Sequence, residues 1–186
     1  IVVPSSDSLN KVWSYHKYLG YGNIIGRFGS VRDINDFFIK AQLVGYDQYR
    51  AIQEGHNTHM WDWYTGMLGW KNQNPWTALR GFFCDYYLDY TGGYFGYKHG
   101  AAPVHIQFNL NDSSVCILNQ TARDFNNITA SITLYDLHGN TVSEYSKQLT
   151  INAHNLVPLN KVILPKTITE EVYFLRLILS DKEKVI

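Results

Sequence analysis

The period of the hydrophobic pattern changes near Pro103, and this change restricts the folds that the chain can form. Before Pro103, apolar residues recur at helical spacing, whereas after it they alternate with polar residues along short segments. Helices and strands therefore dominate different parts of the 186 residues. We expect an α/β region in residues 1–103 and a separate β domain in residues 104–186.

The longest helical pattern extends from about Asp33 to Trp61. Its apolar side chains recur at helical spacing and would form one buried stripe. The members of this stripe are Ile34, Phe37, Phe38, Ala41, Tyr49 and Ile52. Asp33 is placed to cap the helix, Asp36 lies in its first turn, and Gly45 is a weak point within it.

The residues that follow this helix have the order of an α/β barrel. The short apolar run 65–70 predicts a buried parallel strand, and the proline-containing stretch 71–76 predicts a loop at the carboxyl end of that strand. A helical or irregular aromatic segment is expected at 77–90, and glycines then interrupt the pattern before Pro103. Helix, buried strand, loop and helix in succession are typical of the last turn of a (β/α)8 barrel, the TIM-barrel fold.

Residues after Pro103 have the two-residue period of β-strands. Strands are expected at 104–110, 114–119, 128–134, 141–151 and 171–180, with a hairpin turn at residues 139–140. Short strands at this spacing indicate an antiparallel, immunoglobulin-like β-sandwich. We count about six strands, so we expect a sandwich that lacks its last strand.

Charge and hydropathy exclude several classes of function. Lysine plus arginine balance aspartate plus glutamate at 16 each, so nothing favours binding to nucleic acid or to an anionic membrane. No run of about 18 apolar residues could span a bilayer. The chain also contains no nucleotide-binding loop, dinucleotide fingerprint or nucleophile-elbow motif, and we expect no cofactor.

The N-terminus and the glycosylation sequons bear on processing. Residues 1–6 are not a signal peptide and suggest an internal start, as proteolytic processing would produce. Three sequons, at Asn111, Asn119 and Asn127, favour passage through the secretory pathway, to a lysosome, a vacuole or the cell exterior. Cys84 and Cys116 could pair or could both be free thiols.

The most informative polar stretch is the expected loop 70–76. Its indoles can stack on the faces of sugar rings, and its side-chain amides can donate to and accept from hydroxyl groups. The candidate sugar-binding residues here are Trp70, Asn72, Gln73, Asn74 and Trp76. His16, in the polar-aromatic cluster 15–18, is a further candidate. Packing of the same indoles against a helix is the alternative.

No catalytic pair of carboxylates is evident in the sequence. Glu54 and Asp62 could be paired acids, but Glu54 falls in the helical pattern, where a solvated or capping role fits better. Asp85 and Asp89 could also be paired, but surface exposure fits them better. Residues 56 and 59 are histidines at helical spacing without a third ligand, so we expect no metal site. A retaining glycosidase needs two carboxylates about 5–5.5 Å apart, one as nucleophile and one as acid and base. Nothing in this sequence supplies a persuasive pair.

Several of these segments resemble one family of enzymes. Residues 40–55 resemble the penultimate barrel helix of family 2 glycoside hydrolases, in the branch of plant-type mannosylglycoprotein endo-β-mannosidases and exo-β-D-glucosaminidases. Residues 64–81 look like the eighth strand of that barrel and its loop, and residues 85–107 look like the passage into the next sandwich domain. The resemblance, which also includes residues 13–18, covers nearly all of residues 12–180.

The resemblance implies a retaining β-glycosidase whose catalytic glutamates precede Ile1 in the sequence. The loop residues Trp70 to Trp76 would then border the sugar-binding pocket, and Gly69 replaces a larger residue usual on that strand. The run Asn-Gln-Asn-Pro-Trp is closer to the endo-β-mannosidases, which cleave the Manβ1–4GlcNAc bond of N-glycans. The partners implied are other polypeptides of the same precursor, which would carry the rest of the barrel, and a glycan substrate.

Two other interpretations remain open. The chain could be a binding module that holds a glycan without cleaving it, or a scaffold whose aromatic residues are all core. A barrel fragment exposes apolar faces that isolated domains seldom tolerate. This favours a processed subunit with obligate partners.

Overall fold

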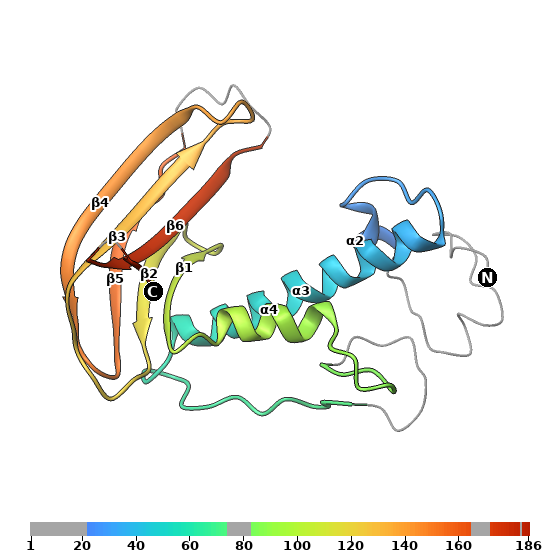
Figure 1. Ribbon diagram of the computed structural model, residues 1–186, viewed down its shortest axis with the longest axis horizontal. Helices are drawn as coiled ribbons and strands as arrows, with labels where there is room; N and C mark the ends of the chain where they lie inside the picture. The colour runs from blue at the N-terminus through green and yellow to red at the C-terminus, as the bar shows by residue number, and fades with distance from the viewer. Residues whose placement is uncertain (1–21, 74–82, 165–171, 183) are drawn as a thin grey trace. The chain divides into compact units, whose positions relative to one another are not determined.

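A computed structural model divides the chain into two compact units (Figure 1). The structure describes residues 22–73, 83–164, 172–182 and 184–186. The first unit comprises the described residues up to Gln53 together with those of Tyr64–Gly100, and the second comprises Glu54–Trp63 and Ala101–Ile186. The junction after Gly100 lies close to the expected boundary at residue 103. The sequence did not indicate that Glu54–Trp63 belongs with the β domain.

The long helix is present as α3, Ile34–Thr58. It ends three residues before the expected Trp61. The expected cap is confirmed, because Asp33 Oδ1 accepts hydrogen bonds from the backbone N–H groups of Asn35 and Asp36, both at 2.9 Å.

A buried carboxylate ties the start of α3 to the preceding loop. Asp36 accepts hydrogen bonds from the Arg32 guanidinium at 3.0 Å and from Lys40 Nζ at 2.9 Å. Lys40 Nζ also donates to the carbonyl oxygens of Gly29 and Ser30. The hydrogen bond from Arg32, followed by that from Lys40, holds the pKa of Asp36 well below its usual range.

The core of the first unit lies between α3 and the short helix α2, Gly22–Gly26. Ile25, Phe37 and Val44 are buried there, with partly buried apolar side chains around them. Phe38 and Ile52, which the sequence placed in the buried stripe, are exposed. The buried face of α3 is therefore narrower than the sequence pattern predicted.

The glycines expected to interrupt the chain instead form a helix, α4, Gly92–Gly100, which lies along α3 (Figure 1). Gly92, Gly96 and Gly100 recur every four residues and face α3. A methyl group on Gly96 would collide with the backbone carbonyl of Tyr46 in α3. Backbone contact between the helices outweighs the poor helix propensity of glycine, and this is why the prediction was wrong.

Residues 65–70, expected to be a buried strand, are extended without forming one in this structure. Leu68 is 99% exposed, and an isolated parallel bridge between Gln73 and Cys84 follows the segment. A strand forms only where a neighbouring strand supplies hydrogen-bonding partners, and no ladder between the described residues includes residues 65–70.

The second unit contains an antiparallel β-sandwich, as predicted. Its described strands are β1 (Val104–Asn109), β2 (Ser114–Asn119), β3 (Phe125–Tyr135), β4 (Thr141–Ile151), β5 (Asn155–Lys161), β6 (Phe174–Asp181) and β7 (Lys184–Val185). One sheet has the order β1-β2-β5 and the other the order β4-β3-β6-β7 (Figure 1). The sequence did not predict β5 or β7.

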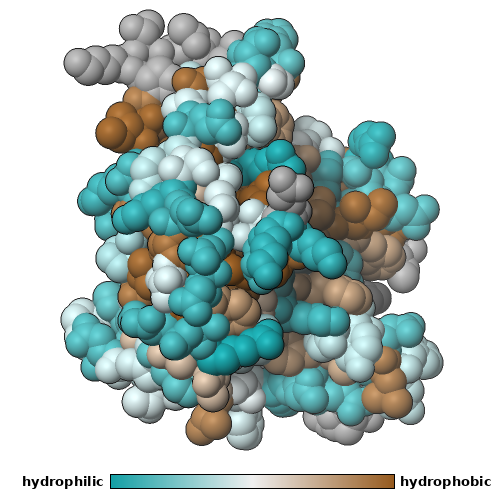
Figure 2. Space-filling model, turned by 60° about the vertical axis from the view of Figure 1, so that its left-hand side comes forward, coloured by the Kyte–Doolittle hydropathy of each residue, from teal (hydrophilic) through white to brown (hydrophobic). Residues whose placement is uncertain are grey.

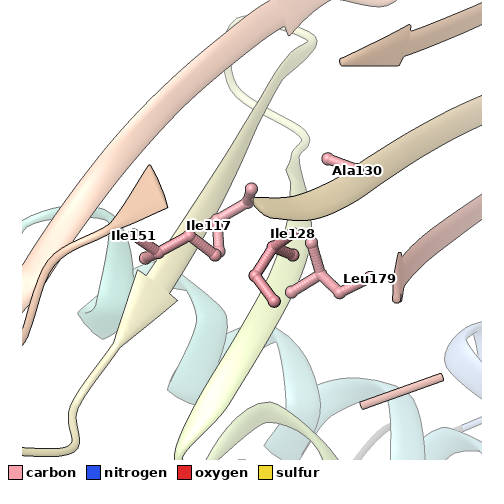
Figure 3. Packing of buried hydrophobic residues seen from close by; sticks show 5 residues of the cluster. All are labelled: Ile117, Ile128, Ala130, Ile151 and Leu179. Carbon is pink, nitrogen blue, oxygen red and sulfur yellow. The ribbon is translucent and has the colours of Figure 1, made fainter. Parts of the chain in front are cut away.

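The core of the sandwich is aliphatic. Ile117 of β2 meets side chains of β3, β4 and β6, which point toward one another between the two sheets (Figure 3). These partners are Ile128, Ala130, Ile151 and Leu179. All five are at most 2% exposed, so replacing one of the larger members by alanine would cost about 2–5 kcal/mol.

Hydrophobic side chains also reach the surface. On the face shown in Figure 2 they form separate brown patches among hydrophilic residues. Among the residues that the structure describes, no helix combines the length and the apolar character needed to cross a membrane. Scattered apolar side chains are ordinary on protein surfaces and do not by themselves indicate a binding site.

We predict that Gly96→Ala destabilises the protein by about 2 kcal/mol or more, because the added methyl group meets backbone that cannot move aside. Gly55→Ala is the matched control, since Gly55 lies in α3 with open space around it. The control should be neutral or stabilising by less than about 1 kcal/mol. Thermal unfolding of both variants measures the difference, and equal melting temperatures would contradict the packing described for α4.

We predict that Asp36→Asn lowers the melting temperature at neutral pH. The pKa of Asp36 is lowered in the folded state, so its contribution to stability is present above the ordinary carboxyl pKa and is lost as the pH falls below it. Wild type and variant should therefore converge in acid. Asp47→Asn is the control, because the Asp47–Arg27 pair is exposed and should contribute little. A constant difference at every pH would contradict the assignment.

Candidate functional site

The described part of the expected sugar-binding loop is Trp70–Gln73. Trp70 is 91% exposed, and the peptide bond between Trp70 and Lys71 is cis. The carbonyl of Asn72 accepts a hydrogen bond from the N–H of Cys84 at 3.1 Å, and Gln73 Nε2 lies 3.5 Å from the carbonyl oxygen of Asp85. The structure thus brings Asn72 and Gln73 beside the turn at residues 84–90, whereas Trp70 projects into solvent.

Asp85 organises that turn. Its Oδ1 accepts hydrogen bonds from the backbone N–H groups of Tyr87 at 2.8 Å and Asp89 at 3.0 Å. Surface exposure, which the sequence favoured for Asp85 and Asp89, holds for Asp89, whereas Asp85 is half-buried and its carboxylate closes the turn.

Aromatic rings surround the same turn. Tyr90 stacks on Tyr94 of α4 with ring centroids 4.1 Å apart, and Tyr86 meets Tyr87 edge-on. Tyr86, Tyr87 and Tyr90 are exposed. Stacking faces and side-chain amides therefore occur in the same unit, which is a combination suited to holding a sugar rather than to breaking bonds.

Three of the predicted sugar-binding residues, His16, Asn74 and Trp76, lie outside the described residues. Their roles stay predictions. Within the described part of the chain, no three His, Cys, Asp or Glu side chains gather closely enough to hold a metal ion.

The second unit contains a buried polar cluster that the sequence analysis missed. It joins the last two turns of α3 to one face of β1. Gln107 Nε2 donates to the carbonyl of Glu54 at 2.8 Å, and Asn57 Nδ2 donates to Gln107 Oε1 at 3.1 Å. Glu54 Oε1 lies 3.0 Å from His105 Nε2, with both side chains largely buried. Glu54 is therefore neither solvent-exposed nor available as a catalytic acid beside Asp62.

The alternation of apolar and polar residues along β1 concealed this polar cluster in the sequence. Such alternation ordinarily places the apolar set inside and the polar set at the solvent, yet His105, Gln107 and Asn109 are the more buried set. The continuous apolar run in β2, Val115–Leu118, was the signal that could have revealed a sheet buried on both faces.

Both cysteines are free thiols in the structure. Cys116 belongs to β2 and accepts a weak hydrogen bond from Asn109 Nδ2 at 3.6 Å. Burial raises the pKa of the Cys116 thiol, so it is held in the protonated, unreactive form.

The three sequons differ in accessibility. Asn111 lies in the exposed β1–β2 turn, and Asn127 is exposed at a register shift in β3. Asn119 is 0% exposed, and its Nδ2 donates to the carbonyls of Arg123 and Asn152. The candidate site at Asn119 is therefore wrong for this fold, because a glycan on Nδ2 would require that the buried bonds break.

We predict that peptide mapping of the native protein by mass spectrometry finds no glycan on Asn119. If the protein passes through the secretory pathway, occupancy is expected at Asn111 and Asn127, whose amides face solvent. A glycan on Asn119 would contradict the hydrogen bonding described here.

Comparison with known proteins finds relatives that cover most of the chain, although no protein-family model matches it. The chain is 40% identical over 164 residues to a mannosylglycoprotein endo-β-mannosidase of Lilium longiflorum, a match that covers 85% of this chain and 17% of the lily protein. It is 37% identical over 127 residues to an exo-β-D-glucosaminidase of Amycolatopsis orientalis, covering 67% of this chain and 12% of that protein. The chain thus spans less than a fifth of the length of these relatives.

The solved structures that resemble this chain include glycosidases as well. An exo-chitosanase of Amycolatopsis orientalis, in complex with PNP-β-D-glucosamine, matches 87% of this chain and 20% of its own, with a TM-score of 0.79 and 30% identity. A β-D-mannosidase of Dictyoglomus thermophilum matches 93% of this chain and 22% of its own with a TM-score of 0.79, and at 16% identity it shows the fold alone. From its sequence relatives, its β-sandwich and these structural neighbours together, the chain belongs to the family 2 glycoside hydrolases, in the branch of mannosylglycoprotein endo-β-mannosidases and exo-β-D-glucosaminidases.

Proposed function

We propose that this chain is part of a retaining β-glycosidase that hydrolyses β-mannosidic bonds, in particular Manβ1–4GlcNAc of N-glycans. The observation that carries the proposal is the 40% identity to the lily mannosylglycoprotein endo-β-mannosidase across 85% of the chain. Because the chain spans 17% of that relative, the activity belongs to a larger assembly.

In that assembly, residues 64–73 would be the last strand and loop of a (β/α)8 barrel, followed by an immunoglobulin-like domain. The exposure of Leu68 and Trp70 supports this, since an apolar extended segment needs neighbouring strands to cover it. Those strands would come from other polypeptides of the same precursor or from another part of one longer chain.

Within such a barrel, the Trp70–Gln73 loop would lie at the carboxyl end of its strand, where barrel enzymes place their active sites. A retaining glycosidase uses one carboxylate as nucleophile and a second carboxyl group as acid and then base. This chain would supply neither. Trp70 would stack on a pyranose face, and the amides of Asn72 and Gln73 would bind hydroxyl groups and orient the ring for attack.

A location in the secretory pathway, ending in a vacuole, a lysosome or the cell exterior, is part of the proposal. Its support is the exposure of two sequons, Asn111 and Asn127. N-glycans are also made and trimmed along this pathway, so enzyme and substrate would occur in the same compartments.

Exo-β-D-glucosaminidase activity is the second candidate. It is favoured by the match to the Amycolatopsis orientalis exo-chitosanase in complex with PNP-β-D-glucosamine, at 30% identity over 87% of this chain. The two activities differ in the group at C2 of the sugar, a hydroxyl in mannose and an ammonium in glucosamine. The ratio of kcat/KM values for aryl β-mannoside and aryl β-glucosaminide therefore decides between them.

The proposal predicts that Trp70→Ala lowers kcat/KM of the native protein on a Manβ1–4GlcNAc glycopeptide by about tenfold or more, through loss of stacking. Phe174→Ala is the control. Phe174 is also an exposed aromatic residue, but it lies in β6 of the sandwich and outside the loop. Equal losses in the two variants would argue against the loop as a sugar site. Failure of the native protein to hydrolyse either β-mannosides or β-glucosaminides would refute the proposed function itself.

A further inference from the structure

We propose that the second unit carries an additional, non-catalytic site for a pyranose ring, at the turn that follows α3. We call this feature the tryptophan turn; it consists of His59, Trp61, Asp62 and Trp63, together with His154 from the connection between β4 and β5. It lies outside the Trp70–Gln73 loop and does not depend on the proposed function.

The backbone of the turn is well defined. The N–H groups of Asp62 and Trp63 both donate to the carbonyl of His59, at 3.2 and 3.0 Å, and the N–H of Met60 donates to the carbonyl of Asn57 at 3.1 Å. Trp61 has a φ of 66°, in the left-handed region that bulky residues rarely adopt. Such a conformation persists only where the surroundings impose it, and it is found often at ligand sites.

An imidazole contacts each of the two indoles. The ring of His59 stacks on Trp63 with centroids 4.4 Å apart and planes inclined by 6°. His154 meets Trp61 edge-on, with centroids 6.3 Å apart. Trp63 nevertheless remains 70% exposed and Trp61 43% exposed. One face of the Trp63 indole is covered by His59, so its exposed area presents a flat aromatic surface to solvent.

Core packing does not account for this arrangement, because a core indole is mostly covered. Single exposed aromatic side chains are common, but here two indoles within three residues flank an exposed carboxylate, Asp62. The ring contacts also limit the motion of the indoles before any ligand binds, which lowers the entropic cost of binding.

The chemistry of the turn selects the class of ligand. A pyranose has an apolar C–H face, which can stack on an indole, and a rim of hydroxyl groups, which can donate to the carboxylate of Asp62. A nucleic acid base could also stack, but its phosphates would be repelled by Asp62, and the chain has no net charge to compensate. The fit is therefore to a glycan, either a neutral hexose or an amino sugar whose ammonium would pair with Asp62.

The test uses the intact native protein labelled with 5-fluorotryptophan and observed by ¹⁹F NMR. The Trp61 and Trp63 resonances are assigned as those missing from Trp61→Phe and from Trp63→Phe. Manno-oligosaccharide and glucosamine oligosaccharide are titrated separately, and the two titrations distinguish a neutral from a cationic sugar. We expect the Trp63 resonance to shift saturably with one of them.

Three variants complete the test. Trp63→Ala should weaken binding, measured on the Trp61 resonance, by about tenfold or more, whereas Trp63→Phe, which keeps a ring, should weaken it less. Leu137→Ala, at an exposed apolar residue in the β3–β4 hairpin, should leave binding unchanged. Hydrolysis of a small aryl glycoside should also be unchanged in all three variants.

The proposal is overturned if neither oligosaccharide shifts the Trp63 resonance. It is also overturned if Trp63→Ala, folded as judged by thermal unfolding, binds as tightly as wild type. If Trp63→Ala fails to fold, Trp63→Phe is titrated in its place and followed at its Trp61 resonance. No response of that resonance to either oligosaccharide would exclude the site. Loss of aryl glycoside hydrolysis in folded Trp63→Ala would also overturn the proposal, because the residue would then belong to the catalytic site rather than to a separate one.

Discussion

The outer face of the sheet β1-β2-β5 must be covered, because its middle strand carries apolar side chains on both sides. Val115 and Ile117 face the sandwich core, while Leu118 pairs with His105 and Cys116 pairs with Gln107 on the opposite face, and all four β2 side chains are buried. The last turns of α3 and the turn after it belong to this unit, and the helix turns meet β1 through hydrogen bonds. A sandwich made from residues 101–186 alone would leave that face open to water.

The side chains of α3 that cover this sheet are polar, so their contact with β1 fixes the geometry of the helix as well as stabilising it. A buried amide such as that of Gln107 is favourable only while its partners are in place, and removing one partner leaves the other desolvated at a cost of about 1–3 kcal/mol. Helix α3 can therefore meet β1 in few registers. The pairing of α3 with α4 is restricted in a different way, since Gly92 and Gly96 permit backbone contact at positions where any larger residue would collide. In both contacts of α3, other arrangements are excluded because they would leave buried polar groups unpaired or would make atoms collide. The buried hydrophobic area does not select the arrangement.

Buried and exposed side chains of this chain are suited to different tasks. Buried carboxylates and amides, including Asp36, Glu54 and Asn119, are engaged in holding the chain together. The side chains suited to a sugar, indoles and neighbouring amides, are at the surface on turns and loops. Membership of a glycosidase family is consistent with a chain that binds and positions a substrate, while the two carboxylates of the reaction are expected in other parts of the assembly.

The sequence by itself determined the elements whose signal is local. The spacing of apolar residues and the cap at Asp33 located α3, and the two-residue period located most of the sandwich strands. The family, too, could be identified from sequence, because the run around Trp70 is distinctive.

Only the tertiary structure decided the features that depend on contacts between distant segments. The helix at Gly92–Gly100 depends on contact with α3. The burial of His105 and Gln107 depends on partners some 50 residues away in the sequence. The accessibility of the Asn119 sequon is set by hydrogen bonds to backbone carbonyls of other segments. Residues 65–70 show the converse, since an apolar run has the composition of a strand but becomes one only when neighbouring strands supply its hydrogen bonds.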